Sequence, residues 1–114
     1  MTREDHLRAL LDQEQQRVRA RVTKLEAELG QLTHARRSES DDDEHDPEGV
    51  TLSSQWSMLA GLVSSAQEDA RQAEEAMRRF NSGSYGLCAA CTQPIPAGQL
   101  EARPFRERCV PCAS

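Results

Sequence analysis

Hydrophobic residues recur every three or four positions along the first third of the chain. From Arg3 to about Arg37 there is no proline, and this spacing places the apolar side chains on one face of an α-helix. Thr2 and Asp5 resemble a capping box at its start. We therefore predict a helix over about 3–37 with one apolar stripe, formed by Leu7, Leu11, Val18, Val22, Leu25, Leu29 and Leu32.

A second stretch, about 51–81, has a more regular heptad pattern. Two helices of similar length, each with one narrow apolar stripe, favour an antiparallel pair, and alanines in the second stripe would let the backbones approach closely. Residues 1–83 are therefore predicted to form a coiled-coil hairpin. The second stripe consists of Leu52, Trp56, Leu59, Val63, Ala66, Ala70, Ala73, Met77 and Phe80.

An acidic segment, 38–50, separates the two stretches and is interpreted as the tip of the hairpin. Asp46-Pro47 and Gly49 indicate a turn there. The second helix could begin with Asp46 as cap and Pro47 as first residue, or with Thr51 as cap. The acids could reach Mg²⁺ or a basic channel in a partner, or could form a solvated loop. They are Glu39, Asp41, Asp42, Asp43, Glu44, Asp46 and Glu48.

Composition narrows the class of protein further. Aromatic residues make up 4% of the chain, which is little for a globular core but enough for a coiled-coil seam. The net charge of −5 comes from the acidic segment, and this argues against a general nucleic-acid binder. The chain has no apolar run long enough for a membrane span and a charged rather than signal-like start. We expect a cytoplasmic protein.

The helical period stops after Phe80, and residues 84–114 hold four cysteines in two C-x-x-C pairs. Two such turns can complete a closed tetrahedral shell around Zn²⁺, which leaves no position for a catalytic water. The predicted ligands of this one structural zinc are Cys88, Cys91, Cys109 and Cys112. A redox dithiol or disulfide pair is the alternative. Turns or short strands are expected here, packed by Ile95, Leu100, Phe105 and Val110.

These features predict a mainly α fold: a long antiparallel coiled-coil helical hairpin followed by a small C-terminal four-cysteine zinc ribbon. The chain contains no phosphate-binding glycine loop, nucleophile–base pair or open metal site, so an enzyme is not expected.

The cysteine module resembles the DksA/TraR family of C4-type zinc-finger proteins. The resemblance lies in Tyr85-Gly86-Leu87-Cys88, Ile95, Leu100-Glu101-Ala102-Arg103-Pro104 and Cys109-Val110-Pro111-Cys112. The phrase DEHDPEG also looks like short actinobacterial members. The resemblance implies a regulator of transcription that inserts its hairpin into the secondary channel of RNA polymerase and does not read DNA sequence.

The same resemblance suggests roles for individual residues. Tip contacts to the polymerase would come from Asp42, Asp43, Glu44, Asp46 and Glu48, of which Asp46 best matches the family. Arg103 matches a residue that contacts the alarmone ppGpp in some relatives, but the matching helix position holds no lysine, so an alarmone response is not expected. Thr92 replaces a frequent glycine, which implies some strain in that turn. A monomer is expected.

Two other functions remain open at this point. The coiled coil and cysteine module could serve a different protein partner, or the thiols could act as a redox switch.

Overall fold

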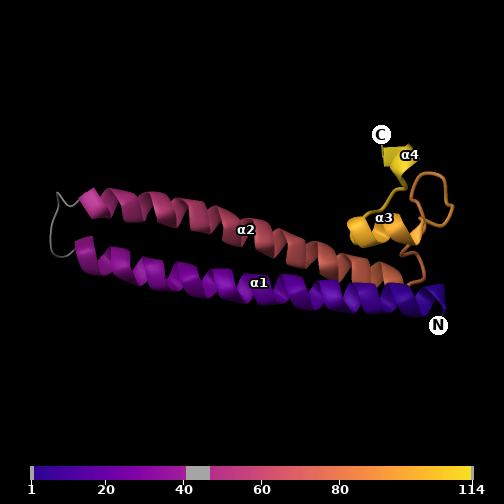
Figure 1. Ribbon diagram of the computed structural model, residues 1–114, viewed down its shortest axis with the longest axis horizontal. Coiled ribbons are helices and arrows are strands. Elements are labelled where there is room, and N and C mark those ends of the chain that lie inside the picture. Colours follow the sequence, from indigo (N-terminus) through magenta and orange to yellow (C-terminus); the bar gives the residue numbers. More distant parts are fainter. Residues whose placement is uncertain (1, 41–46, 114) are drawn as a thin grey trace. The chain divides into compact units, whose positions relative to one another are not determined.

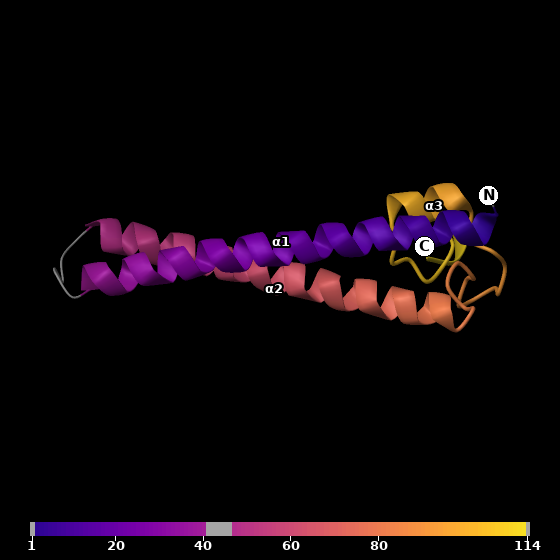
Figure 2. The same ribbon diagram turned by 90° about the horizontal axis from the view of Figure 1, so that it is seen from below.

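The computed structural model describes residues 2–40 and 47–113 of the chain, and it confirms the predicted fold class. Two long helices, α1 (Arg3–Ser40) and α2 (Pro47–Asn81), run antiparallel (Figures 1 and 2). Two short helices follow, α3 (Ala97–Ala102) and α4 (Val110–Ala113). The β structure within these described residues is one isolated bridge between Leu87 and Pro94. None of the described helices is long and apolar enough to cross a membrane.

The ends of the long helices follow from local sequence. At the start of α1, the backbone N–H of Asp5 donates to Thr2 Oγ1 at 3.1 Å, and the Asp5 carboxylate accepts the N–H of Thr2 at 3.3 Å. This is the reciprocal capping box that the sequence predicts. Helix α2 begins at Pro47, where the fixed φ of proline suits the first helical position. Gly83, with φ of 85°, follows the end of α2 in the left-handed conformation.

The chain divides into two compact units, each of which contains parts of both long helices. The middle unit is Arg19–Asp69, and the cysteine unit joins Met1–Val18 to Ala70–Ser114. The helix bounds extend beyond the expected ranges 3–37 and 51–81. The proposed domain boundary between 83 and 84 stays a prediction.

The middle unit is held by a narrow apolar seam with polar contacts beside it. Its buried residues are Leu25, Val63 and Ala66, with Val22, Leu29 and Leu59 packed against them. The Trp56 indole N–H donates to Thr33 Oγ1 at 2.8 Å, and the Arg36 guanidinium lies 5.1 Å from the centre of the Trp56 ring. Both contacts join α1 to α2, so Trp56 packs in the seam as its heptad position predicts.

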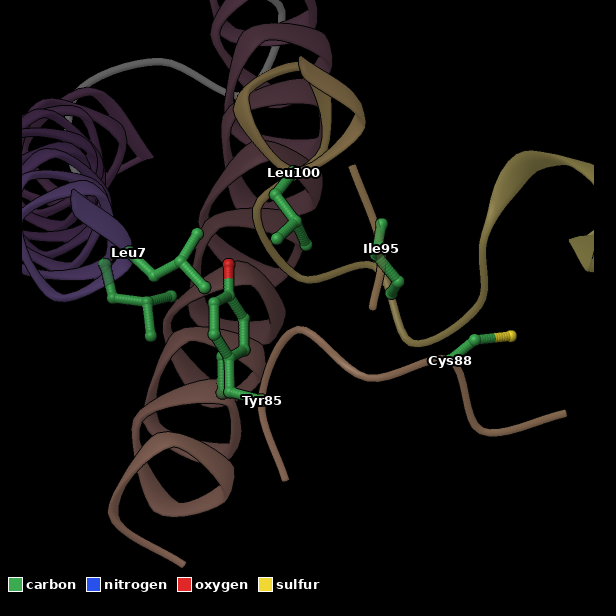
Figure 3. Close-up of a cluster of buried hydrophobic side chains, with 7 residues drawn as sticks. Leu7, Tyr85, Cys88, Ile95 and Leu100 are labelled. Atoms are coloured by element: carbon green, nitrogen blue, oxygen red, sulfur yellow. The ribbon is translucent and has the colours of Figure 1, made fainter. Parts of the chain in front are cut away.

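The cysteine unit has a larger apolar cluster, in which the first turns of α1 meet the cysteine module. Figure 3 shows Leu7 of α1 facing Tyr85, with Leu100 and Ile95 beside them. The Cys88 sulfur points away from these side chains (Figure 3), so the cluster lies on one side of Cys88 and the thiol on the other. The buried members are Leu7, Leu11, Ala76, Tyr85, Cys88, Ile95 and Leu100.

Two expectations for the cysteine module were wrong. Residues 97–102 form a helix rather than a turn or strand, because a helix of six residues is too short to show a hydrophobic period. Val110 does not pack in the module, since it begins α4 with 49% of its surface exposed. Ile95 and Leu100 are completely buried, as predicted, and Phe105 packs against the same cluster.

Gly86 should be intolerant of a side chain. Its φ is +86°, and an added Cβ would lie 3.1 Å from Leu7 Cδ1. We expect Gly86→Ala to lower the free energy of unfolding by ~1–3 kcal/mol, measured by urea denaturation of the zinc-loaded protein. Gly98→Ala is the matched control, because Gly98 lies in α3 with nothing within 4 Å of an added Cβ. Equal stability of Gly86→Ala and the parent chain would contradict this reading of the turn.

Candidate metal centre

The four cysteines come together although the two pairs are distant in sequence. One Sγ from each of Cys88, Cys91, Cys109 and Cys112 lies within 4.8 Å of the other three. The Sγ atoms of Cys91 and Cys109 are 3.9 Å apart. In a tetrahedral site with Zn–S bonds of about 2.3 Å, neighbouring sulfurs are about 3.8 Å apart. The donor set and its spacing therefore fit one Zn²⁺.

The first pair lies on a tight turn that the Leu87–Pro94 bridge closes. The N–H of Cys88 donates to the carbonyl of Gln93 at 2.9 Å, and the N–H of Thr92 donates back to the carbonyl of Cys88 at 2.9 Å. These two bonds fold residues 88–93 back on themselves. To close this turn, one residue must adopt the left-handed backbone conformation. Thr92 does so, with φ of 65°. The strain that the sequence predicts at Thr92 is confirmed, because a β-branched residue rarely adopts this φ.

The second pair lies at the start of α4. The N–H groups of Cys112 and Ala113 donate to the carbonyl of Cys109 at 3.1 and 3.0 Å. This helical turn places the thiols of Cys109 and Cys112 on one side. The N–H of Ala89 donates to the carbonyl of Glu107 at 2.8 Å, which joins the two turns by a backbone bond.

Backbone N–H groups also point at one of the sulfurs. The N–H of Cys91 and that of Cys109 each lie 3.4 Å from Cys88 Sγ. These two donors, Cys91 first, lower the pKa of the Cys88 thiol to about 6, because they stabilise the thiolate. Cys88 is thus prepared for metal binding, which requires the thiolate form.

The pKa values of two neighbouring thiols, Cys91 and Cys112, are raised instead of lowered. The hydrogen bond with Cys109, followed by those with Cys88 and Cys91, raises the pKa of Cys112 to about 12. For Cys91, the N–H of Gln93 lowers the pKa, but the hydrogen bond to Cys88, burial and the hydrogen bond to Cys109 together raise it above its ordinary value. Four neighbouring thiolates repel one another, so the cluster suits a divalent cation that offsets their charge.

Helix α1 supports the cysteine module through contacts that sequence reasoning missed. The Nη2 group of Arg3 donates to the carbonyl of Ile95 at 2.6 Å and to the carbonyl of Gly86 at 3.3 Å. His6 Nε2 lies 2.9 Å from Glu101 Oε1. Arg3 precedes these carbonyls by more than eighty residues, and a single arginine at a helix start carries no sequence signal of such a partner.

Tyr85 makes a hydrogen bond within the cysteine module. Its hydroxyl donates to the carbonyl of Pro104 at 2.7 Å, and burial raises the pKa of Tyr85 to about 12. Arg79 of α2 adds an ion pair with Glu107 at 3.4 Å. The segment between the two cysteine pairs is therefore fixed at several points.

Of the other candidate site residues, Arg103 is the one whose side chain the structure describes. Asp42, Asp43, Glu44 and Asp46 lie outside the described residues, as does the side chain of Glu48. Arg103 follows the last residue of α3 with its side chain exposed, and its N–H donates to the carbonyl of Gln99 at 3.0 Å.

A four-cysteine metal centre that follows a long helical hairpin defines the class: a C4-type zinc-finger protein with one structural Zn²⁺. Residues 83–114 match the family model described as the prokaryotic dksA/traR C4-type zinc finger. The match covers the cysteine module, which is the part of the sequence that carries the resemblance to the DksA/TraR family.

A solved structure shares the fold. It is that of transcription factor DksA2 from Pseudomonas aeruginosa, which superposes with a TM-score of 0.80 over 96% of this chain and 79% of that chain. The two sequences are 23% identical. A search of curated proteins finds no match.

Zinc affinity should rise steeply with pH. Cys112, with a pKa of about 12, and Cys91, with a raised pKa, are protonated at neutral pH and must each lose a proton to bind metal. Each released proton weakens binding about tenfold for every unit by which the pH falls. We therefore expect at least roughly a hundredfold change per unit near pH 7, measured by competition with a chromophoric chelator. A pH-independent affinity would contradict metal binding by thiolates.

Thr92→Gly should stabilise the cysteine unit. Relief of left-handed strain at a β-branched residue gains ~1–3 kcal/mol, and the added freedom of glycine in the unfolded chain removes roughly 0.5–1 kcal/mol. A net gain of about 1 kcal/mol is expected in urea denaturation of the zinc-loaded protein. Thr92→Ala, the control, keeps the strain and loses the 2.6 Å bond from Thr92 Oγ1 to the carbonyl of Cys91. A Thr92→Gly variant less stable than the parent would show that this bond outweighs the strain.

Proposed function

We propose that this protein is a non-enzymatic regulator of transcription that binds RNA polymerase in the cytoplasm. The observation that carries the proposal is the DksA/TraR-type zinc finger at residues 83–114. The shared fold with a protein described as a transcription factor supports it. Nothing in the arrangement of the described side chains calls for a reaction, because the four clustered thiols suit a closed structural site.

In this proposal, Zn²⁺ bound by Cys88, Cys91, Cys109 and Cys112 fixes the cysteine unit. The zinc joins two turns that share one direct backbone bond, from Ala89 to Glu107. The apolar cluster and the Arg3 bonds then fix these turns against the first turns of α1. The metal therefore contributes to folding rather than to chemistry.

The acidic segment between the long helices is the part proposed to enter the secondary channel of the polymerase. Asp42, Asp43, Glu44, Asp46 and Glu48 would supply carboxylates near the catalytic Mg²⁺ or a basic wall of the channel. Of these, Asp46 has the best match to the family pattern. Such insertion would change the lifetime of open promoter complexes without any reading of DNA sequence.

The proposal includes neither recognition of DNA sequence nor binding of the alarmone ppGpp. An acidic segment repels DNA, so promoter choice would come from the polymerase and not from this chain. Arg103 is the candidate alarmone contact, but the chain has one lysine, Lys24, away from the matching position, and the proposal does not include ppGpp. The protein is proposed to act as a monomer.

Binding to RNA polymerase tests the proposal directly. We expect purified polymerase to bind the zinc-loaded protein in a pull-down and by surface plasmon resonance. Asp46→Asn should weaken the effect on open-complex lifetime on the order of tenfold, because a carboxylate placed beside a cation is lost. Glu28→Gln is the matched control, since it removes an exposed carboxylate of α1. If the parent protein does not bind polymerase at all, the proposal is wrong.

A further inference from the structure

A side chain of α3 makes a hydrogen bond to the second cysteine turn. The backbone N–H of Val110 donates to Oε1 of Gln99 at 2.9 Å. Gln99 belongs to α3, and Val110 directly follows the candidate metal ligand Cys109. The bond therefore joins α3 to the segment that supplies Cys109 and Cys112.

Gln99 accepts a backbone N–H that α4 cannot satisfy by itself. The first four N–H groups of a helix have no partner within that helix. In α4, the N–H groups of Cys112 and Ala113 reach the carbonyl of Cys109, and the proline of this turn has no N–H. The N–H of Val110 remains, and the Gln99 side chain supplies its acceptor.

This bond acts on the peptide unit that follows Cys109. A peptide unit is planar, so its carbonyl and its N–H turn together. Its carbonyl, that of Cys109, accepts two N–H groups of α4, and its N–H, that of Val110, donates to Gln99. The unit is thus held at both edges. Because its orientation sets the ψ angle of Cys109, Gln99 helps to set the direction of the Cys109 side chain.

The peptide unit that precedes Cys109 is held in the same way. The N–H of Cys109 lies 3.4 Å from Cys88 Sγ, and the carbonyl of Arg108 accepts a bond from Arg106 Nη1 at 3.2 Å. Together with the Gln99 bond, these contacts give every polar group of the two peptide units beside Cys109 a partner. The backbone around this ligand is therefore oriented from several segments, and Gln99 contributes the contact from α3.

Helix α3 is itself anchored, so Gln99 offers its oxygen from a fixed support. Leu100 is completely buried in the apolar cluster of the cysteine unit. Glu101 Oε1 lies 2.9 Å from Nε2 of His6 in α1. An acceptor on an anchored element loses little conformational freedom when it makes its bond.

The second cysteine turn needs such support because α4 has four residues, and a helix of this length is not stable in water by itself. The Gln99 bond is made in the conformation in which the four sulfurs lie within ligand distance. A contact that raises the population of the binding-competent conformation also raises the apparent affinity for the ligand.

We propose that Gln99 is a positioning residue of the zinc centre. It supplies no ligand atom, but it accepts the Val110 N–H and thereby favours the conformation in which Cys109 and Cys112 can bind Zn²⁺ together with the first cysteine pair. The inference concerns zinc affinity, so it can be tested whether or not the chain binds RNA polymerase. In the competing account, Gln99 stabilises α4 equally with and without zinc.

The test makes the same substitution at two glutamines. Gln99→Met keeps the length and helix propensity of the side chain but removes the acceptor. Gln93→Met is the matched control, because Gln93 lies beside the first cysteine pair with an exposed side chain, and its backbone carbonyl accepts the N–H of Cys88. Gln99→Glu retains a side-chain oxygen at the same reach and is the rescue variant.

Zinc affinity is measured by competition with a chromophoric chelator in about 0.5 M salt, which screens the added charge of the glutamate. We expect Gln99→Met to bind zinc about tenfold more weakly than the parent protein, and Gln93→Met to bind it equally well. Gln99→Glu should bind more tightly than Gln99→Met. Urea denaturation of the zinc-free proteins should give the same midpoint for Gln99→Met and the parent.

Three results would overturn the inference. The first is equal zinc affinity of Gln99→Met and the parent protein, including the case in which the zinc-free variant is less stable, which would support the competing account. The second is an equal loss of affinity in the two methionine variants. The third is a Gln99→Glu variant that binds zinc no better than Gln99→Met, because the acceptor oxygen would then not matter.

Discussion

The cysteine unit depends on one constraint: its two cysteine turns must lie next to each other so that their four sulfurs can bind one metal ion. Each turn is built by local hydrogen bonds, one through the left-handed Thr92 and the other through the first turn of α4. Neither turn has an apolar core of its own. The four sulfurs lie within ligand distance of one another, and Ile95, Leu100 and Tyr85 pack with Leu7 of α1 on the side away from the Cys88 thiol. Metal and apolar cluster thus hold the same segment from two sides.

The start of α1 has a larger part in this arrangement than its distance in sequence suggests. Leu7 lies against Gly86 closely enough that a Cβ there would crowd it, and Arg3 bonds two carbonyls of the module. The hairpin and the zinc finger are therefore joined by packing as well as by chain continuity. Loss of zinc should destabilise the first turns of α1, since they share a core with the cysteine turns.

Much of the fold could be predicted from sequence because it rests on periodic or short-range signals. The heptad stripes predicted the buried positions Leu25, Val63 and Ala66, and the doubled C-x-x-C spacing predicted the cysteine cluster. Helix α3 and the exposed Val110 were missed, because a short helix has no period and burial in a small module depends on neighbours. The Arg3 bonds were missed since they join residues that only the fold brings together.

The proposed contact of the acidic segment with polymerase depends on the salt concentration. Attraction between the acidic segment and a basic or Mg²⁺-bearing surface weakens as salt rises, because exposed charges are screened beyond about 8 Å at physiological ionic strength. Charge would then act mainly on the rate of encounter. The carboxylates of the acidic segment would therefore steer the chain towards polymerase from a distance, and this steering would weaken as salt rises.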